Sequence, residues 1–446
     1  MKTSKQIGKW LAMGALLLAS GAGALAATSI WTGGGADDNW DTTGNWDNVP
    51  EVNDTINFGN LTPSVPTVSV DNNHADLLVG QINFSGTTAY TISGLVITST
   101  NSNNVVINSS SVRQTISADF YSGWSANART INGGAAGLEF AKYVNTVGDG
   151  NWEHNIQGTV IFQQFYIGNS RPQGGYNLSF TGNGTVIIGD LHASQDTTLT
   201  NNYAISLYNG QKMVLTGTVA ADVRNDFQIN HVNSSLTLTG DANANAFSTI
   251  NMNNGSLINN SSVRLDKLTW KTGTLGGTGS ILATKGVLAT VNGTYAIAPG
   301  DINSVGKLSF TDENLVWDKE FSTVTYDWNF SDLNAAAGVG YDQIFVEQGF
   351  DLGVNTQYVL NLVGLGGATI DDFAAANPGA TWDIISAGNG ITNFESSRWD
   401  YELPEDMVLT LSADSTTLQL MLIPEPSTWL LLGGGVALLA FLRRRR

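Results

Sequence analysis

Leu236-Thr237-Leu238-Thr239-Gly240 is a short run of alternating apolar and small polar residues that ends at a glycine. Its last three residues repeat Leu215-Thr216-Gly217, which lies 23 residues earlier. Similar runs of four to six residues, separated by Asn/Gly turns, continue from Ser29 to about Ser309. Alternation of this kind is typical of β-strands. No stretch before Thr369 keeps a helical period for three turns, so the sequence predicts an all-β protein.

A repeated spacing indicates how these strands are arranged. Isoleucine followed by Asn or Gln recurs at steps of 26, 25, 24 and 25 residues, at Ile56, Ile82, Ile107, Ile131 and Ile156. A coil of three strands of about five residues and three turns of about three needs roughly 24 residues. The spacing therefore predicts a right-handed parallel β-helix, or solenoid, over residues 27–306. An array of β-sandwiches is the alternative.

Composition excludes several classes of function. Gly contributes 50 residues, charged residues make up only 13%, and cysteine is absent, which leaves no thiol nucleophile and no cysteine-ligated metal. Between the two terminal segments described below, 13 basic residues face 37 acidic ones, a net charge of −24. A body this acidic repels nucleic acid and would attract cations.

The N-terminal residues 1–26 have the three parts of a secretory signal peptide. Lys2, Lys5 and Lys9 form a positive region, and an apolar run too short to span a membrane follows. Ala24 and Ala26 then supply the small residues of a cleavage site, although Ala22-Gly23-Ala24 would serve as a competing site.

The C-terminal residues 424–446 have a different three-part pattern. Pro424, Glu425 and Pro426 precede the uncharged segment Trp429 to Leu442, and four arginines close the chain as Arg443, Arg444, Arg445 and Arg446. Arginine blocks stay on the cytoplasmic side of a membrane, so the preceding chain is expected on the far side. This order resembles the PEP-CTERM sorting signal of bacteria that make extracellular polysaccharide. The resemblance implies recognition and processing by an exosortase.

The length of the apolar segment supports transient rather than permanent anchoring. Its 14 residues would form roughly 21 Å of helix, whereas a bilayer core is about 30 Å thick. Gly433, Gly434 and Gly435 weaken that helix further. We expect a C-terminal transmembrane helix that serves as a handle for processing; a plain membrane anchor and a buried core helix are the alternatives.

The body carries a second resemblance. Its motifs are Trp31-Thr32-Gly33-Gly34-Gly35, Asn39-Trp40-Asp41, Gly44-Asn45-Trp46-Asp47, Leu275-Gly276-Gly277-Thr278-Gly279, Ala298-Pro299-Gly300 with Gly306-Lys307-Leu308, and Tyr341-Asp342-Gln343-Ile344. Together these motifs resemble those of autotransporter-associated β-strand repeat proteins. The resemblance implies that this chain has a passenger-like body. We expect Gly276, Gly277 and Gly279 to allow tight positive-φ corners between stacked strands.

Residues 307–423 have denser apolar runs and are predicted to form a β-rich C-terminal cap that covers the open strand edges of the solenoid. Thr369 and Asp372 have the spacing of a helix N-cap and its third residue, which predicts one short helix before Pro378-Gly379.

No motif for catalysis, a metal or a cofactor is found. His74, His154, His192 and His231 are isolated, and Glu153-His154 is expected on an exposed strand or loop because adjacent strand residues point to opposite faces. Asp37, Asp38 and Asp41 are better explained as a solvated acidic turn than as a cation site. Trp124, Trp152, Tyr166 and Tyr176 could stack on sugar rings, but core or turn packing is the more common role of large aromatics.

These expectations favour a non-enzymatic, exported surface or extracellular-matrix protein of structural or adhesive type, sorted through its C-terminal signal by an exosortase. It would be tethered by the C-terminal helix and then pass to the cell surface or the medium. The alternative is a polysaccharide-binding or polysaccharide-degrading β-helix. The expected partners are the exosortase, the membrane and extracellular polysaccharide, with no nucleic acid and no cofactor.

Overall fold

The fold is built from short strands. The computed structural model describes residues 26–423, apart from 62–66, 75–76, 101–102, 123–128, 146–150, 169–175, 195–201, 220–223, 241–245, 290–292, 301–302, 312–314, 317–322, 370–371, 373–379 and 404–406. Within those ranges the elements are strands β1–β35 together with the three-residue 3-10 helices η1 (Thr43–Asn45) and η4 (Ser396–Arg398). The predicted all-β class is confirmed.

The first half of the array contains strands of three to ten residues. They are β1 (Thr28–Trp31), β2 (Thr55–Phe58), β3 (Thr67–Asn72), β4 (Leu77–Val79), β5 (Gln81–Phe84), β6 (Ala89–Gly94), β7 (Ile97–Ser99), β8 (Asn104–Asn108), β9 (Gln114–Ser122), β10 (Arg129–Asn132), β11 (Leu138–Asn145), β12 (Asn151–Gln157), β13 (Thr159–Gly168), β14 (Tyr176–Thr181), β15 (Thr185–Ser194), β16 (Asn202–Leu207) and β17 (Lys212–Leu215).

The second half begins with the two longest strands. Its strands are β18 (Arg224–Leu238), β19 (Ala246–Asn259), β20 (Ser262–Trp270), β21 (Gly273–Gly277), β22 (Ser280–Ala283), β23 (Val287–Ala289), β24 (Thr294–Pro299), β25 (Lys307–Thr311), β26 (Leu315–Val316), β27 (Thr323–Phe330), β28 (Gln343–Val346), β29 (Phe350–Asp351), β30 (Gln357–Gly364), β31 (Thr381–Ala387), β32 (Ile391–Thr392), β33 (Trp399–Tyr401), β34 (Met407–Leu411) and β35 (Thr417–Leu422).

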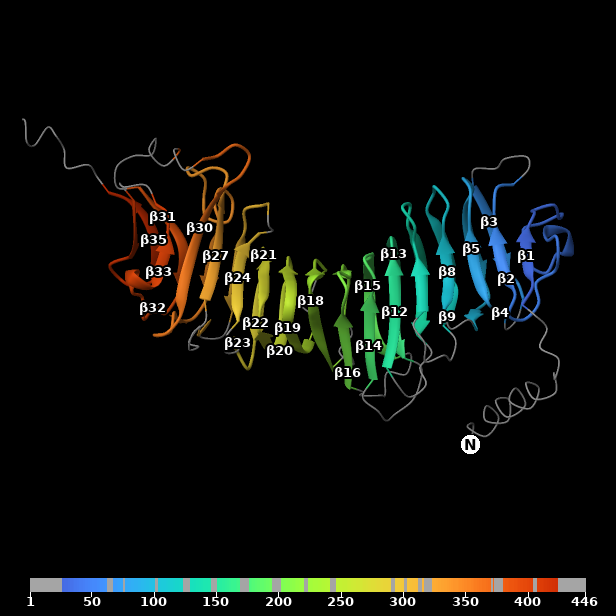
Figure 1. The fold of residues 1–446 in the computed structure, drawn as a ribbon, viewed down its shortest axis with the longest axis horizontal. Helices are drawn as coiled ribbons and strands as arrows, with labels where there is room; N and C mark the ends of the chain where they lie inside the picture. The colour runs from blue at the N-terminus through green and yellow to red at the C-terminus, as the bar shows by residue number, and fades with distance from the viewer. Residues whose placement is uncertain are drawn as a thin grey trace, which may run out of the picture.

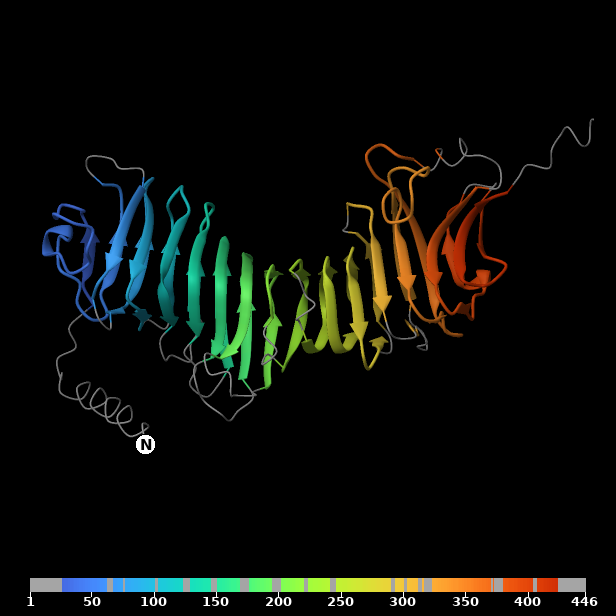
Figure 2. The same ribbon diagram turned by 180° about the vertical axis from the view of Figure 1, so that it is seen from behind.

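Most strands pair in parallel with a strand one coil further along the chain. Strand β12 lies between β10 and β14, and β13 lies between β11 and β15, all in parallel register. The strands therefore stack along the long axis from the N-terminal to the C-terminal end, as Figure 1 and the reverse view in Figure 2 show. Thirty-two of the strands form one hydrogen-bonded sheet, and β26, β29 and β32 form a second.

The register agrees with most of the predicted spacing. Ile56 pairs with Ile82, Ile131 with Ile156, and Leu215 with Leu238. The exception is the prediction for Ile107, because Ile82 and Ile131 both pair with Val106 instead. The ladder between β8 and β10 shifts register by one residue, and a bulge of this kind moves the side-chain pattern to the other face. The sequence spacing alone does not reveal that shift.

Glycines allow the coils to stack closely in two ways, by adopting a positive φ and by leaving room for a neighbouring backbone. Gly277 has φ of +109°, which a side chain would strain, whereas a Cβ built on Gly279 would meet the Ser261 carbonyl oxygen at 2.0 Å. The expected positive φ therefore applies to Gly277, while Gly276 and Gly279 have no positive φ and serve close backbone approach instead. Gly276 also leaves no space for a side chain, because its Cβ would lie 2.7 Å from the Ala298 carbonyl oxygen.

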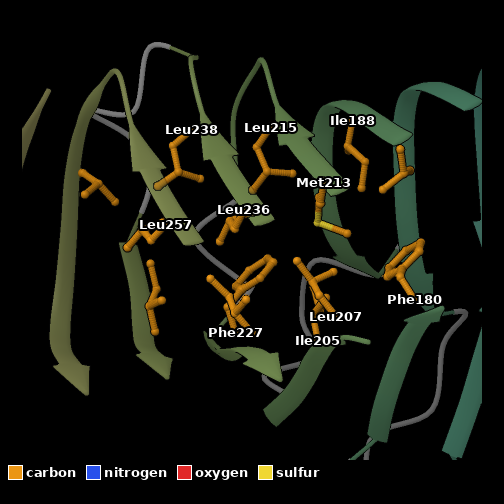
Figure 3. Packing of buried hydrophobic residues seen from close by; sticks show 14 of the residues in the cluster. Phe180, Ile188, Ile205, Leu207, Met213, Leu215, Phe227, Leu236, Leu238 and Leu257 are labelled. Atoms are coloured by element: carbon orange, nitrogen blue, oxygen red, sulfur yellow. The ribbon is translucent and has the colours of Figure 1, made fainter. Parts of the chain in front are cut away.

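Alternation along each strand directs one set of side chains into a continuous core. In β15, Val186 and Ile188 are fully buried, whereas Ile187 between them is only partly buried. Side chains from successive coils stack on one another inside the array, as Figure 3 shows for Met213, Leu236 and Leu257. Each fully buried aliphatic side chain contributes about 1.5–3 kcal/mol relative to exposure, so the core rather than any cross-link holds the stack together.

The N-terminal end of the core is covered by aromatic rings. Trp31, Trp40 and Trp46 are buried and pack on one another and on Phe58, with ring centroids 4.9–6.1 Å apart. The Trp46 indole N–H donates to the Trp40 carbonyl oxygen at 2.7 Å. These tryptophans hide the first coil from water, which explains why the sequence places them together at the start of the body.

The C-terminal end is closed by antiparallel strands. Strand β35 pairs antiparallel with both β31 and β34, in contrast to the parallel ladder before it. Parallel pairs β22–β25 and β24–β27 cross residue 306. The predicted boundary between a body at 27–306 and a cap at 307–423 stays a prediction.

Predicted helices lie mostly outside the described residues. In the part of the chain that the structure describes, no helix has the length and hydropathy needed to cross a bilayer; the predicted transmembrane helix belongs to residues 424–446, beyond that part. The Thr369 N–H donates to Asp372 Oδ2 at 2.6 Å, which is the contact expected from a capping pair. The rest of that predicted short helix also lies outside the described ranges.

Candidate functional site

The predicted site residues lie at the two ends of the chain. Ala26 is exposed and lies two residues before the start of β1 at Thr28. The others fall outside the described residues: Ala24, Pro424, Glu425, Pro426, Arg443, Arg444, Arg445 and Arg446.

The C-terminal segment follows the last strand of the sheet, β35, almost directly in the sequence. Leu422 is 4% exposed and ends β35, whose N–H and carbonyl groups pair with β31 and β34. Ile423 follows and is 43% exposed. Pro424 has no backbone N–H and cannot extend a ladder. The sorting tripeptide therefore begins within two residues of the folded array, with no intervening linker.

Comparison with known families identifies this segment. The family model described as the PEP-CTERM protein-sorting motif matches residues 422–446. No curated protein and no solved structure significantly matches the chain. The predicted sorting motif is confirmed, and it implies export, surface sorting and processing by an exosortase.

A buried polar cluster, which the sequence analysis missed, lies at one corner of the coils. The Arg129 guanidinium donates to Asn145 Oδ1 at 2.7 Å and to Ser122 Oγ at 3.1 Å, and it lies 4.6 Å from the centroid of the Trp152 ring. Strands β9 and β11 end here, and β10 and β12 begin here. All four side chains are buried, so the cluster joins neighbouring coils from within.

His154 belongs to the same buried region. Its expected place on an exposed strand or loop is wrong, because the side chain has no exposed surface and packs against Tyr143, Phe165 and Phe180. Its Nε2 lies 3.2 Å from the Tyr143 hydroxyl. Burial, assisted by the nearby positive charge of Arg129, lowers the pKa of His154 from 6.5 to about 3. The imidazole is therefore neutral at pH 7.

This burial follows from a simple pattern in β12. Trp152, His154 and Ile156 alternate along the strand and are all buried, while Glu153 between them is exposed. Two-residue periodicity anchored on Ile156 would have placed His154 inside. The cluster has no exposed side chain and stabilises the corner; it offers no surface to a substrate.

A second buried polar group lies near the C-terminal end. Asp342 is fully buried, and its carboxylate accepts hydrogen bonds from the Gly306 N–H at 2.7 Å and from the Asn329 N–H at 2.9 Å and Nδ2 at 2.7 Å. Burial raises the pKa of Asp342 to about 7, although these hydrogen bonds act in the opposite direction. The motif residues around Gly306 and Asp342 thus meet in one structural node that joins β25, β27 and β28.

The aromatic residues considered for sugar stacking have different environments. Trp152 is buried, and Trp124 and the side chain of Tyr176 lie outside the described set. Tyr166 is partly buried and stacks on His192, with centroids 4.5 Å apart and an interplanar angle of 12°. Lys142 Nζ lies 5.6 Å from the centroid of the Tyr166 ring. Tyr166 is therefore packed by neighbouring side chains on the outer face.

The acidic turn near the N-terminus has internal partners. Asp37 accepts hydrogen bonds from the Thr42 hydroxyl at 2.6 Å and from the Asn39 side chain at 2.8 Å. The Thr42 hydrogen bond is the largest cause lowering the pKa of Asp37. Among the described residues, no group of three or more His, Asp and Glu side chains is placed to hold a metal ion.

Proposed function

We propose that this chain is a structural or adhesive protein of the cell surface or extracellular matrix, without catalytic activity. The sorting motif is the observation that carries this proposal, because it directs an exported chain to the envelope. An extended body with an acidic, polar exterior suits display at a surface, where repeated backbone ladders give stiffness and net negative charge keeps the chain soluble.

We infer that the body is a right-handed parallel β-helix. Parallel pairing at steps near 25 residues supports this assignment, and crossover connections between parallel strands are right-handed in nearly all known sheets. The resemblance to autotransporter-associated β-strand repeats gains a physical basis from Gly279, Gly306 and Asp342. These motif residues occupy places where close packing or a buried hydrogen bond requires them.

We further propose that the C-terminal helix tethers the chain until the exosortase cuts it. Only Ile423 separates Leu422 from Pro424 in the sequence, so the motif follows directly on the end of β35. The processing enzyme would therefore meet the sorting signal with the β31–β35–β34 sheet beside it. Release or transfer to the cell surface would follow cleavage.

Binding or degradation of polysaccharide is the alternative proposal, with polysaccharide as a further partner. Its support among the described residues is limited to the outer-face aromatic Tyr166, which His192 and Lys142 already contact. Binding of the purified body to a glycan array, or release of sugar from extracted matrix, would favour this alternative over the structural one.

The sorting proposal is tested by changing the motif and following the protein. Replacing Pro424, Glu425 and Pro426 with Ala, Gln and Ala should leave an unprocessed chain in the membrane fraction of the native host. Replacing Ser427 and Thr428 with alanine is the matched control, since it leaves the tripeptide intact. Equal processing of the motif variant and the control would contradict the proposed role of the motif.

A further inference from the structure

A buried carboxylate holds the residue at which the array begins. Asp54 is 5% exposed, and its Oδ1 accepts the Ala27 N–H at 2.8 Å. Its Oδ2 accepts the Glu51 N–H at 2.9 Å and the Ser29 hydroxyl at 3.3 Å. The Ala27 carbonyl oxygen in turn accepts the Thr55 N–H at 2.8 Å. Ala27 is therefore fixed on both sides of its Cα atom.

Among the described residues, the partners of Asp54 are neutral in the chain that still carries its signal peptide. The hydrogen bonds to its carboxylate come from two backbone amides and one hydroxyl. None of the ion pairs found among the described residues involves Asp54. A buried carboxylate is most stable when at least one partner carries a positive charge.

Removal of the leader would supply that charge at the same atom. Hydrolysis of the Ala26–Ala27 peptide bond adds one water, leaves a carboxylate on Ala26 and leaves an amine on Ala27 that takes up a proton. Both residues are exposed, as a protease requires. The new ammonium nitrogen would be the atom that now lies 2.8 Å from Asp54 Oδ1.

We propose that the mature chain begins at Ala27 and that its α-ammonium forms an ion pair with Asp54 that locks the first coil. This ion pair would distinguish between the two candidate cleavage sites of the signal peptide, after Ala24 and after Ala26. Cleavage after Ala24 would leave two extra residues, so the nitrogen of Ala27 would remain an amide, and the charge would lie up to roughly 7 Å further along the chain.

The ion pair would make the stability of the first coil depend on removal of the signal peptide during export. The hydrogen bond between Ala27 and Asp54 joins the residue before β1 to the residue before β2. A charge-assisted hydrogen bond is roughly twice as strong as a neutral one, so the first coil would become more stable once the leader is removed. This inference depends on the export part of the proposed function and is independent of the C-terminal tail.

The test uses N-terminal sequencing and a two-by-two comparison. The exported protein is sequenced from its native host, and the expected first residue is Ala27. The chain to Arg446 is then prepared with its first residue at Ala27 or at Ala26, each with Asp54 or with Asp54→Asn. Amide hydrogen exchange in β1 and β2 is measured for all four proteins.

With Asp54, the chain that begins at Ala26 should exchange roughly tenfold faster in β1 and β2 than the chain that begins at Ala27. With Asp54→Asn, the two starts should exchange alike. Asp47→Asn is the control, since Asp47 accepts the Ile30 N–H at 2.6 Å in the same coil without touching Ala27; it should preserve the difference between the two starts.

Equal exchange of the two Asp54 chains would overturn the ion pair, and this comparison does not depend on the folding of Asp54→Asn. A first residue of Leu25 in the exported protein would overturn the proposed start. Failure of tail processing would affect neither result, so the outcome separates this inference from the sorting proposal.

Discussion

The burial of His154 predicts an acid-dependent loss of stability that one substitution should remove. The folded pKa of about 3 lies below the ordinary value of 6.5. A histidine with a depressed pKa stabilises the folded state above its unfolded pKa, and this contribution is lost as the pH falls from about 6.5 towards 3. Protonation would place a second positive charge beside Arg129 in a region without solvent.

The magnitude follows from the two pKa values. Between pH 7 and pH 5, the neutral imidazole should account for a loss of about 2 kcal/mol in the free energy of unfolding. His154→Gln removes the titration and keeps a hydrogen-bonding group near the Tyr143 hydroxyl, which now lies 3.2 Å from Nε2. The variant should therefore lose about 2 kcal/mol less than the natural chain over this interval.

Guanidinium unfolding at pH 7 and pH 5, followed by tryptophan fluorescence, measures this difference. His231→Gln is the matched control, because the His231 side chain is only partly buried and its Nδ1 accepts the Asn233 N–H. Equal changes in the free energy of unfolding between pH 7 and pH 5 for His154→Gln and the natural chain would refute the placement of a neutral imidazole in the core.

Two further substitutions test other parts of the array. Asp342 has its pKa raised to about 7, so its contribution to stability is present at low pH and is lost as the pH rises through 7. Relative to Asp342→Asn, the natural chain should gain about 2–3 kcal/mol between pH 8 and pH 5 in denaturant unfolding, and no relative gain would contradict the buried carboxyl. Gly279→Ala should lower the free energy of unfolding by about 3 kcal/mol, because its Cβ would meet the Ser261 carbonyl oxygen at 2.0 Å. Gly59→Ala should be nearly neutral, since the nearest atom to its Cβ lies 3.6 Å away; similar losses for both would argue against close stacking at Gly279.

His154 and Asp342 act in opposite directions on the pH dependence of stability. Acidification from pH 7 to pH 5 destabilises the folded chain through the histidine and stabilises it through the aspartate. Between pH 7 and pH 5 the free energy of unfolding of the natural chain should therefore change less than that of His154→Gln or of Asp342→Asn. Only the single substitutions separate the two contributions.

The sequence predicts the strand class well because alternation is a local property. Ile56, Ile82, Ile131 and Ile156 pair with their neighbours as the spacing predicts. The prediction fails at Ile107, because the successive residues Val105 and Val106 are both buried and Val106 occupies the register position opposite Ile82 and Ile131.

The buried polar groups were harder to predict. Arg129, Asn145 and Trp152 lie on β10, β11 and β12 and meet only after two neighbouring coils stack. Asp342 was recognised as part of a motif, but its hydrogen bonds to Gly306 and Asn329 depend on long-range register. His154 is the exception, since the two-residue alternation with Ile156 already contained the information.

The sorting signal at the C-terminus could be predicted from the sequence, whereas the cleavage site at the N-terminus could not. The sorting tail is recognised from the order of a tripeptide, an apolar segment and an arginine block, and the family model matches the same residues. The choice between the two leader cleavage sites, however, could not be made from small residues at Ala24 and Ala26 alone. The proposed ion pair between the Ala27 ammonium and Asp54, where the Ala27 N–H now donates, would supply that distinction.

The most direct test of the account is the intact mass and C-terminal peptide of the protein recovered from the cell envelope and from the medium of its native host. If the tail is a sorting signal, the envelope or medium should contain a chain that has lost everything after the region of Pro424, Glu425 and Pro426. A chain that retains Arg446 and is found only in the membrane fraction would contradict sorting and reduce the tail to a plain anchor.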